Sequence, residues 1–425
     1  MAYQEQLETG RQDLESLEFF IRGAMHDVGR TLLETLLKGL KANDDSGKNL
    51  DKRFRYKEER TKTIVTVLGK VEITRSYYYD QKRGEGVVPL DRILDVVGTT
   101  FSPGMRRIMG RVGVYQSFGL GHEDIKELAG IEVTAKEIER ISEDLGAQAE
   151  QFLRTLEEKE RDSQKRPIKI LYATIDGTGV PVVKKETLGR QGKGSDGQAK
   201  TREAKLGCIF TQTGVDKDGY AVRDEDSTTY FGKITTAEEF GKIFNHESLR
   251  RGSERAEKVC MIGDAAPWIW NIAQEYLPQA IQIIDLYHAR EHYWNVARLF
   301  WRKNTRKRNK WAEKRKKELN DGAVHKVIRS IGRLKSTTQE QREVCRCEMN
   351  YFDNNKHRMH YDQYRRAGLF VGSGVIEAGC RTVIGQRLKQ SGMHWTVRGA
   401  NTIIALRCCL FSHLWEDFWA FRAAA

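Results

Sequence analysis

The chain has 425 residues, 39% of them hydrophobic, and carries a formal net charge of +13 with a pI near 9.3. This length allows two or three domains with a sizeable buried core, and the excess of positive charge favours a polyanionic partner. Neither a basic-then-apolar leader nor an apolar run of membrane-spanning length is evident, so no membrane association is expected and a cytoplasmic location is predicted.

The seven cysteines do not indicate a disulfide or zinc framework. They include no Cys-x-x-Cys pair, and their number is odd in a chain for which no secretion signal is expected. This usage predicts reduced thiols and argues against a zinc site built from cysteines.

The first predicted element is a long helix over residues 12–40. Its apolar residues recur every three or four positions and form one stripe, made of Leu14, Leu17, Ile21, Met25, Val28, Leu32, Leu36 and Leu40. A core helix is favoured over a dimer seam, because a coiled coil needs a longer sustained repeat.

A β-hairpin is predicted over residues 53–79, with its turn at Gly69. The flanking runs alternate and are rich in β-branched residues. The hairpin carries a basic and aromatic set, namely Arg53, Arg55, Arg60, Lys62, Arg75 and Tyr77 to Tyr79. This set fits either contact with a phosphate backbone or a solvated strand face, and the sequence favours neither.

Residues 102–146 are predicted to be helical. The segment 123–141 reads as a helix, a glycine-containing turn and a second helix, which is a helix-turn-helix outline. The second helix carries Glu137, Glu139, Glu143 and Asp144, which phosphates would repel. A structural helix pair is therefore the favoured interpretation.

The second half follows a charged linker, residues 154–166. Its predicted order is strand 167–176, a loop with Gly189, Gly192, Gly194 and Gly197, strand 205–213, a strand near 219–231, helix 236–250, and a strand–helix–strand unit over 259–285. The loop lacks the Gly-Lys-Ser/Thr ending of a phosphate-binding loop, so a flexible tip is expected. The connection lengths predict a mixed sheet, and this order is that of the ribonuclease H fold.

Acidic residues stand at the ends of predicted strands, where open α/β sheets place their ligands. Asp176 and Asp264 follow two such strands, and Glu377 lies one turn into a helix entered through small residues. Hard carboxylate oxygens suit Mg²⁺, and two divalent ions can activate a nucleophile and stabilise the leaving oxygen in phosphoryl transfer. A single such Asp is more often a turn or helix cap, but three in this order favour a catalytic site.

Two further features follow Asp285. His288 and His292 share a helical face; a zinc site is conceivable, but contact with DNA or orientation of a carboxylate is favoured. The stretch from Trp301 to Lys317 carries ten basic residues against Glu313 alone, and such a run needs neutralisation, for which DNA phosphate is the natural partner. The predicted DNA contacts are Arg302, Lys303, Arg306, Lys307, Arg308 and Lys310, with Arg381, Arg387 and Lys389 near Glu377.

Five motifs in order resemble the DDE transposases of bacterial insertion sequences, nearest to the ISKra type, with Mutator-like relatives. They are Asp176-Gly-Thr-Gly-Val-Pro, Gly263-Asp-Ala-Ala-Pro-Trp-Ile-Trp-Asn, Asp285-Leu-Tyr-His-Ala, Gly372-Ser-Gly-Val-Ile-Glu and Gly392-Met-His-Trp. The resemblance implies that Asp176, Asp264 and Glu377 form the catalytic triad, and that Asp285 and His288 form the Asp-x-x-His motif of an all-α insertion. Relatives often carry cysteines after a tyrosine run near the hairpin; here Tyr79 is followed by none, which makes a zinc-stapled module doubtful.

The resemblance also implies a domain plan and partners. An α+β DNA-binding domain would span residues 1–155, a ribonuclease H-like core 156–290 and 367–425, and a helical basic insertion 291–366. The expected cofactor is a pair of Mg²⁺ ions, which Mn²⁺ can replace. The expected partners are the terminal inverted repeats of the element and target DNA, bound by a homodimer or higher oligomer at the nucleoid.

Two rival functions stay open. One is a metal-dependent nuclease of the same fold, such as a junction resolvase, which cuts without joining strands. The other is a non-catalytic DNA-binding protein derived from a transposase. The three metal-ready carboxylates argue against the second rival.

Overall fold

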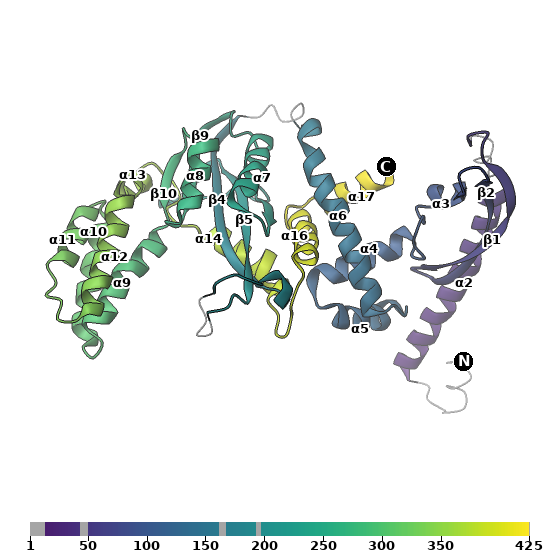
Figure 1. Cartoon of the computed structure of the whole chain (residues 1–425), viewed down its shortest axis with the longest axis horizontal. Coiled ribbons are helices and arrows are strands. Elements are labelled where there is room, and N and C mark those ends of the chain that lie inside the picture. The colour runs from purple at the N-terminus through teal and green to yellow at the C-terminus, as the bar shows by residue number, and fades with distance from the viewer. Residues whose placement is uncertain (1–12, 43–49, 161–166, 193–196, 425) are drawn as a thin grey trace. The chain divides into compact units, whose positions relative to one another are not determined.

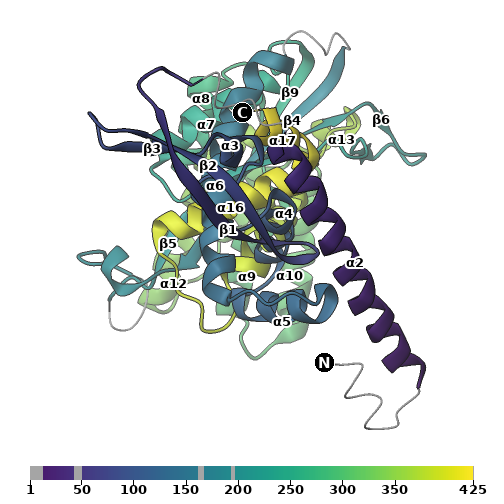
Figure 2. The same cartoon turned by 90° about the vertical axis from the view of Figure 1, so that its right-hand side faces the viewer.

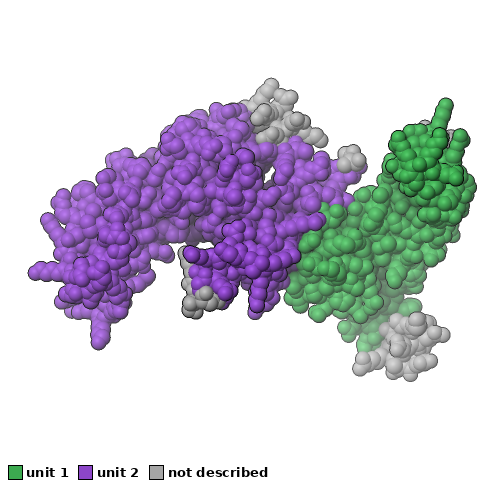
Figure 3. Space-filling view, viewed as in Figure 1, with its two compact units in different colours: residues 1–145 green, residues 146–425 purple. Residues whose placement is uncertain are grey.

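The computed structural model describes residues 13–42, 50–160, 167–192 and 197–424, and the chain divides into two compact units, residues 1–145 and 146–425 (Figures 1 and 3). The boundary falls within helix α6 (Ala135–Glu160), so residues 154–160 of the expected linker are helical, and the rest of that linker lies outside the described residues. Gly194 of the glycine-rich loop lies outside them too. None of the helices in the described part of the chain has the length and apolar character needed to cross a membrane.

Unit 1 combines helices with a three-stranded antiparallel sheet of order β1-β2-β3. Its elements are α2 (Leu14–Ala42), β1 (Arg55–Thr66), β2 (Gly69–Asp80), β3 (Glu85–Val87), α3 (Pro89–Ile93), α4 (Pro103–Tyr115), α5 (Phe118–Ala129) and the first part of α6. The predicted hairpin is confirmed, since β1 and β2 pair antiparallel up to Thr66 and Gly69, where the glycine takes a φ of 103°.

Helix α2 has two apolar faces. Leu33 and Leu37 pack against the core of Ile64, Val71 and Ile73 on the hairpin, along which α2 runs in Figure 2. The predicted stripe from Leu14 to Leu40 lies on another face and is exposed, with exposed fractions between 48% and 71%. The expectation that this stripe is core is therefore wrong: the sheet is narrow and covers only one side of the helix.

The predicted helix–turn–helix segment consists of α5 and α6. Gly130 ends α5 in the left-handed region, with a φ of 66°, and its N–H donates to Lys126 O. The start of α6 is then fixed by packing, because Ile138 and Ile141 are buried. These side chains give the pair a structural role within unit 1.

Unit 2 contains a five-stranded mixed sheet of order β10-β9-β4-β5-β8. Strands β4, β9 and β10 are parallel to one another, and β5 is antiparallel to both β4 and β8. The elements are β4 (Ile168–Pro181), β5 (Thr201–Gln212), β6 (Gly214–Val215), β7 (Ala221–Val222), β8 (Thr229–Lys233), α7 (Ala237–Arg250), β9 (Ala256–Gly263), α8 (Pro267–Tyr276), β10 (Ile281–Ile284), α9 (Leu286–Phe300), α10 (Thr305–Asn320), α11 (Val324–Gly332), α12 (Gln339–Asn355), α13 (Tyr361–Arg366), α14 (Gly374–Gly379), a π-helix (Cys380–Gly385), α15 (Gln386–Leu388), α16 (Val397–Phe411) and α17 (Trp415–Ala424), with short 3₁₀ turns at Lys184–Glu186 and Lys356–Arg358.

The strand expected near residues 219–231 is shorter than predicted. Strand β8 begins only at Thr229, whereas the preceding residues form the small β6–β7 hairpin and a loop. Gly219, with a φ of 82°, makes a turn there. Glycine and the charged residues between Val222 and Thr229 favour turns and loops over a continuous strand.

Helices cover both faces of the sheet in unit 2. On one face, Gly379 of α14 approaches Tyr230 and Leu206, and Ile404 of α16 lies close to Gly232. On the other face, Phe231 packs against the rings of α7. Helices α9 to α13 gather beyond the β10 edge in Figure 1, which puts one long helical segment next to the carboxyl ends of the parallel strands.

Candidate active site at the carboxyl edge of the sheet

The strand register sets three aspartates at one level. Thr174 pairs with Ile262 across β4 and β9, so Asp176 and Asp264 each lie two residues beyond the same pair and on the same face. Gly263 pairs with Ile284 across β9 and β10, which puts Asp285 level with Asp264. The ladder continues past the strand end, where Asp285 N–H donates to Gly263 O at 2.8 Å.

Asp176 and Asp264 are both half-buried and held by nearby backbone N–H groups. Gly177 N–H donates to Asp176 Oδ1 at 2.7 Å, and Ala266 N–H donates to Asp264 Oδ1 at 2.8 Å. The Cys380 thiol donates to Asp176 Oδ2 at 3.5 Å. Asp264 directly follows β9, but Asp176 lies within β4, which continues to Pro181 because its pairing with β5 continues. The prediction that this strand ends at Asp176 is therefore wrong.

Glu377 reaches this region from α14, which covers the same face of the sheet. Ser373, just before the helix, donates from Oγ to Glu377 Oε1 at 3.1 Å. Residues Cys380–Gly385 continue α14 as a π-helix, a distortion common at functional sites. Sequence reasoning located Glu377 but missed Ser373 and Cys380; only the small-residue run before Glu377 carried a hint of Ser373.

Of the residues that the structure describes, Glu377 is grouped at metal-ligand spacing with Asp285 and His288, and not with Asp176 and Asp264. One ligand atom from each of the three grouped residues lies within 4.8 Å of the others, a spacing that can hold a metal ion. Buried Asp285 caps α9 by accepting the N–H of His288 at 2.6 Å, and it accepts the N–H of Ser373 as well. His288 Nδ1 lies 3.3 Å from Asp285 Oδ1. The pairing of His288 with a carboxylate agrees with one of the two roles left open from the sequence, contact with DNA and orientation of a carboxylate.

The charges of these groups act on one another. Burial raises the pKa of Asp176, and the charge of Asp264 raises it further, against the N–H of Gly177 and the thiol of Cys380. The hydrogen bond to Asp285 raises the pKa of His288 to about 9, with Glu377 and Asp264 contributing. At this edge, carboxylates repel one another, and a protonated imidazole lies beside them.

Asp285 itself stays ionised. Burial acts to raise its pKa, but the hydrogen bonds from His288 and Ser373 outweigh burial and lower the pKa below its ordinary value. Tyr351 of α12 is a further residue that the sequence did not indicate. Burial raises the pKa of its hydroxyl, and the charges of Asp264 and Asp285 raise it further, so the helical segment contributes a side chain near this edge.

The family model named Uncharacterised protein family (UPF0236) matches residues 8–414. The chain belongs to the UPF0236 family. Relatives include two UPF0236 proteins of Caldanaerobacter subterraneus subsp. tengcongensis. One is 22% identical over 386 residues, covering 89% of this chain and 74% of the relative, and the other is 20% identical over 385 residues with the same coverage.

One solved structure, the Drosophila P element transposase strand transfer complex, aligns with 73% of this UPF0236 chain and with 80% of its own. The TM-score is 0.26 at 10% sequence identity. A score at this level does not establish a shared fold.

Most of the basic residues predicted to contact DNA are on the surface of this UPF0236 protein. Arg302, Lys303, Arg306, Lys307, Lys310, Arg381 and Lys389 are exposed, and Arg308 is half-buried. Arg302 forms an ion pair with Glu340 at 3.0 Å, and Lys389 donates to Thr178 on β4. Trp301 and Trp311 pack with ring centroids 5.5 Å apart, so these tryptophans brace the end of α9 against α10.

Arg387 is wrong as a DNA contact. Its side chain is fully buried, with the guanidinium 5.0 Å from the Trp395 ring centroid and Nη1 3.4 Å from Met393 Sδ. Burial, with a contribution from the charge of Arg407, lowers the pKa of Arg387 to about 10. Arg387 therefore belongs to the packing beneath α16 and cannot reach a phosphate.

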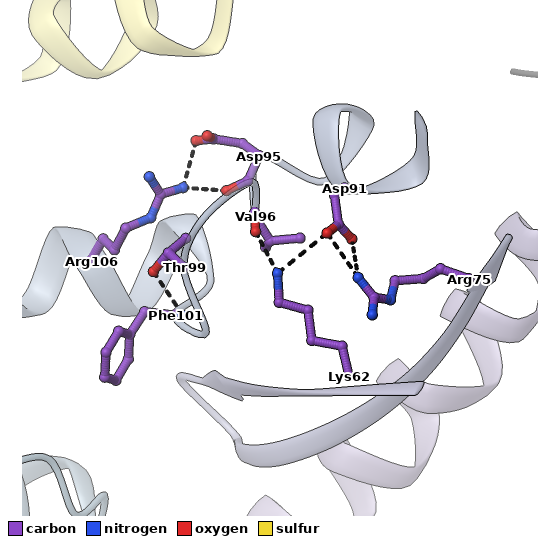
Figure 4. Close-up of polar contacts among 8 residues, drawn as sticks. All are labelled: Lys62, Arg75, Asp91, Asp95, Val96, Thr99, Phe101 and Arg106. Carbon is purple, nitrogen blue, oxygen red and sulfur yellow. Dashed lines mark hydrogen bonds and ion pairs between the residues drawn. The ribbon is translucent and has the colours of Figure 1, made fainter. Parts of the chain in front are cut away.

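Asp91 divides the basic residues of the unit 1 hairpin into two groups (Figure 4). Arg75 Nη1 donates to both Asp91 oxygens at 2.8 Å, and Lys62 Nζ lies 3.4 Å from Asp91 Oδ2 and donates to Val96 O at 2.6 Å. These two cations hold α3 on the sheet and are not available to DNA. Arg53, Arg55 and Arg60 lie outside this contact.

Proposed function

We propose that this UPF0236 protein is a DDE-type DNA transposase of a bacterial insertion sequence, with Asp176, Asp264 and Glu377 as its catalytic carboxylates. The proposal takes the sheet of unit 2 to be ribonuclease H-like. The strand order β8-β5-β4-β9-β10, with an antiparallel half and a parallel half, supports that assignment. Helices α9 to α13 would be the all-α insertion.

The observation that carries the proposal is the common level of Asp176 and Asp264, with Glu377 brought to the same face by a covering helix. β9 and β10 end at this level, whereas β4 continues past Asp176 to Pro181 beside β5. The carboxyl ends of parallel strands are where α/β sheets bind ligands. Burial, and to a lesser extent the charge of Asp264, raise the pKa of Asp176, and a bound cation would favour the ionised carboxylate again.

The donor set fits magnesium. All three side chains offer hard oxygen atoms, and Mg²⁺ takes only a few carboxylates while keeping bound water. Asp176, Asp264 and Glu377 would hold two Mg²⁺ ions, or Mn²⁺ in their place. Such a pair, when bound, activates an attacking oxygen and stabilises the leaving oxygen of a phosphodiester.

The remaining side chains would position these carboxylates. Ser373 holds one oxygen of Glu377, and Asp285 fixes both Ser373 and His288 through hydrogen bonds. His288, protonated at neutral pH, adds a positive charge beside Glu377. In the proposed reaction, water breaks a phosphodiester at the element end and leaves a 3′-hydroxyl; this hydroxyl then attacks a target phosphodiester, so one ester bond forms as another breaks.

The name of one relative supports a mobile element. It joins eleven designations, from TTE0033 to TTE2212, for one UPF0236 protein of Caldanaerobacter subterraneus subsp. tengcongensis. An element that moves between sites leaves several copies of its gene in one genome. The net charge of +13 and the exposed cations of α10 are consistent with a DNA partner.

The test is cleavage of a labelled duplex that carries the end of the element, in Mg²⁺ or Mn²⁺, by the wild type and by Glu377→Gln. Nicking at the end by the wild type alone is expected. Equal cleavage by both proteins would move the third carboxylate elsewhere. No cleavage by either would overturn the proposal in favour of a DNA-binding protein.

A second assay separates a transposase from a nuclease of the same fold. A pre-cleaved end with a free 3′-hydroxyl is offered together with a target duplex. A transposase joins the two into a longer labelled product, whereas a nuclease or junction resolvase leaves the pre-cleaved end unjoined.

Transposition also needs two element ends in one complex, and we propose a homodimer formed through the exposed stripe of α2. The stripe extends over a helix of 29 residues and could bury on the order of 800 Å² per copy, the size of a standard interface. Glu15 and Glu18 lie near its start and Lys38 near its end, so an antiparallel pair places opposite charges next to each other, whereas Lys41 is already paired with Glu59 of the same chain.

Sedimentation of the full chain at micromolar concentration tests the dimer. Leu32→Glu, in the middle of the stripe, is expected to give a monomer. Leu128→Glu, the same change at an exposed leucine of α5, is expected to leave the dimer intact. A wild-type monomer would contradict this interface.

A further inference from the structure

The hairpin of unit 1 has an inner half and an outer half with different surroundings. In the inner half, Ile64, Val71 and Ile73 are buried in the core, and Lys62 and Arg75 are paired with Asp91. In the outer half, residues 55–60 of β1 are all exposed. These six side chains face solvent and are not part of that core.

A groove of about 650 Å³ lies along this outer half. Five of its nine lining residues are basic and two are tyrosines; the full set is Lys52, Arg53, Arg55, Tyr56, Lys57, Tyr79, Asp80, Gln81 and Lys82. A concave surface with this composition concentrates positive potential, because the walls focus the field of several like charges.

The single carboxylate of the groove does not cancel that potential. Asp80 is 3% exposed, and its Oδ1 accepts the N–H groups of Lys82 at 2.9 Å and Arg83 at 3.3 Å. Its Oδ2 lies 3.9 Å from Arg53, which also lies 3.7 Å from Glu85. Asp80 thus fixes the turn through hydrogen bonds and is paired with Arg53. Arg55, Lys57 and Lys82 line the groove, and their positive charges are not paired with Asp80.

The tyrosines give the groove an aromatic wall. Lys57 Nζ lies 4.6 Å from the ring centroid of Tyr79, and Tyr56, 58% exposed, meets Tyr78 edge-on with centroids 6.0 Å apart. Cations interleaved with open aromatic faces are how proteins follow a nucleic acid backbone and stack on unpaired bases.

We propose that this groove is a DNA-binding site, in which Arg55, Lys57 and Lys82 contact backbone phosphates and Tyr56 stacks on an unpaired base. That the DNA is the end of the protein's own element rests on the proposed function; the binding chemistry does not. The site lies in unit 1 and is independent of the carboxylates of unit 2.

The experiment is fluorescence anisotropy of the full chain with a labelled 20-mer, as duplex and as single strand, in EDTA over a series of salt concentrations. The groove variant is Arg55→Glu/Lys57→Glu/Lys82→Glu. It is expected to weaken binding of both DNA forms at least tenfold and to flatten the salt dependence by about three phosphate contacts. Tyr56→Ala is expected to weaken only the single strand, by about fivefold.

The control is Lys126→Glu/Lys136→Glu/Arg140→Glu, which makes the same charge change at exposed positions on α5 and α6 of unit 1. It is expected to bind DNA within twofold of the wild type. Equal weakening by both triple variants, or wild-type binding by the groove variant, would overturn the proposal. Because the substituted groove residues are exposed, unchanged thermal unfolding is required of each variant, and Arg55→Ala/Lys57→Ala/Lys82→Ala provides a milder second set.

The two proposals fail in different ways. EDTA removes any metal-dependent cleavage, so the binding result is independent of the active site. Groove-dependent binding without cleavage by the wild type would retain the groove and reject the transposase. Cleavage by the wild type together with undiminished binding by the groove variant would retain the transposase and reject the groove.

Discussion

Asp91 in unit 1 and Asp264 in unit 2 are both partly or wholly removed from water, but their surroundings are opposite. Asp91 is bound by Arg75 and Lys62, so its charge is fully balanced. Asp264 faces Asp176, and among the residues that the structure describes neither of the two is in an ion pair with a lysine or arginine. A carboxylate paired with cations of its own chain stabilises the fold. Two carboxylates that repel each other instead favour the binding of a cation.

The largest expected effect is at the pair of Asp176 and Asp264, which have no cationic partner among the described lysines and arginines. Asp264→Asn removes a metal ligand and should reduce Mg²⁺-dependent cleavage of the element end by at least about 1,000-fold, since metal positioning supplies most of the rate. Because the variant also relieves repulsion with Asp176, its thermal unfolding temperature should not fall. Quantified nicking beside calorimetry measures both, and a loss of stability that parallels the loss of cleavage would assign Asp264 a folding role.

At Asp91, which is paired with Arg75 and Lys62, the substitution should instead lower the stability of the fold. Asp91→Asn leaves two cations with largely buried side chains and should lower the free energy of unfolding by about 3 kcal/mol. The matched control is Asp27→Asn: in its ion pair the side chains of Asp27 and Arg30 are 68% and 40% exposed, so less than about 1 kcal/mol is expected. Chemical denaturation compares the two, and equal losses would contradict the distinction drawn from burial.

Much of this arrangement could be predicted from the sequence, because it depends on local patterns. Strand ends at Asp264 and Asp285 follow from apolar runs separated by a helix, and the shared level of neighbouring strand ends is a property of parallel pairing. Glu377 was located by the small residues before it. The mixed sheet itself is confirmed.

What failed depends on partners distant in the sequence. Arg387 looked like a DNA contact, but Trp395 and the helix that carries Arg407 bury it. The sequence also allows Arg75 to contact a phosphate backbone, but the structure pairs Arg75 with Asp91. Whether a long cationic side chain is buried or exposed depends on these contacts, and residue spacing carries no information about them.

The smallest expected effect concerns His288, the imidazole beside Asp285 and Glu377. The hydrogen bond to Asp285 raises the pKa of His288 to about 9, so its stabilising contribution is complete below about pH 6.5 and is lost as the pH rises through 9. In EDTA, His288→Gln should therefore cost on the order of 1 kcal/mol at pH 6, a value discounted because 37% of the side chain is exposed, and almost nothing at pH 10. Unfolding measured from pH 6 to 10 checks the sign. Asp285→Asn, which removes the partner, should abolish this pH dependence; a cost that grows toward pH 10 would show that the imidazole is not held as a cation beside these carboxylates.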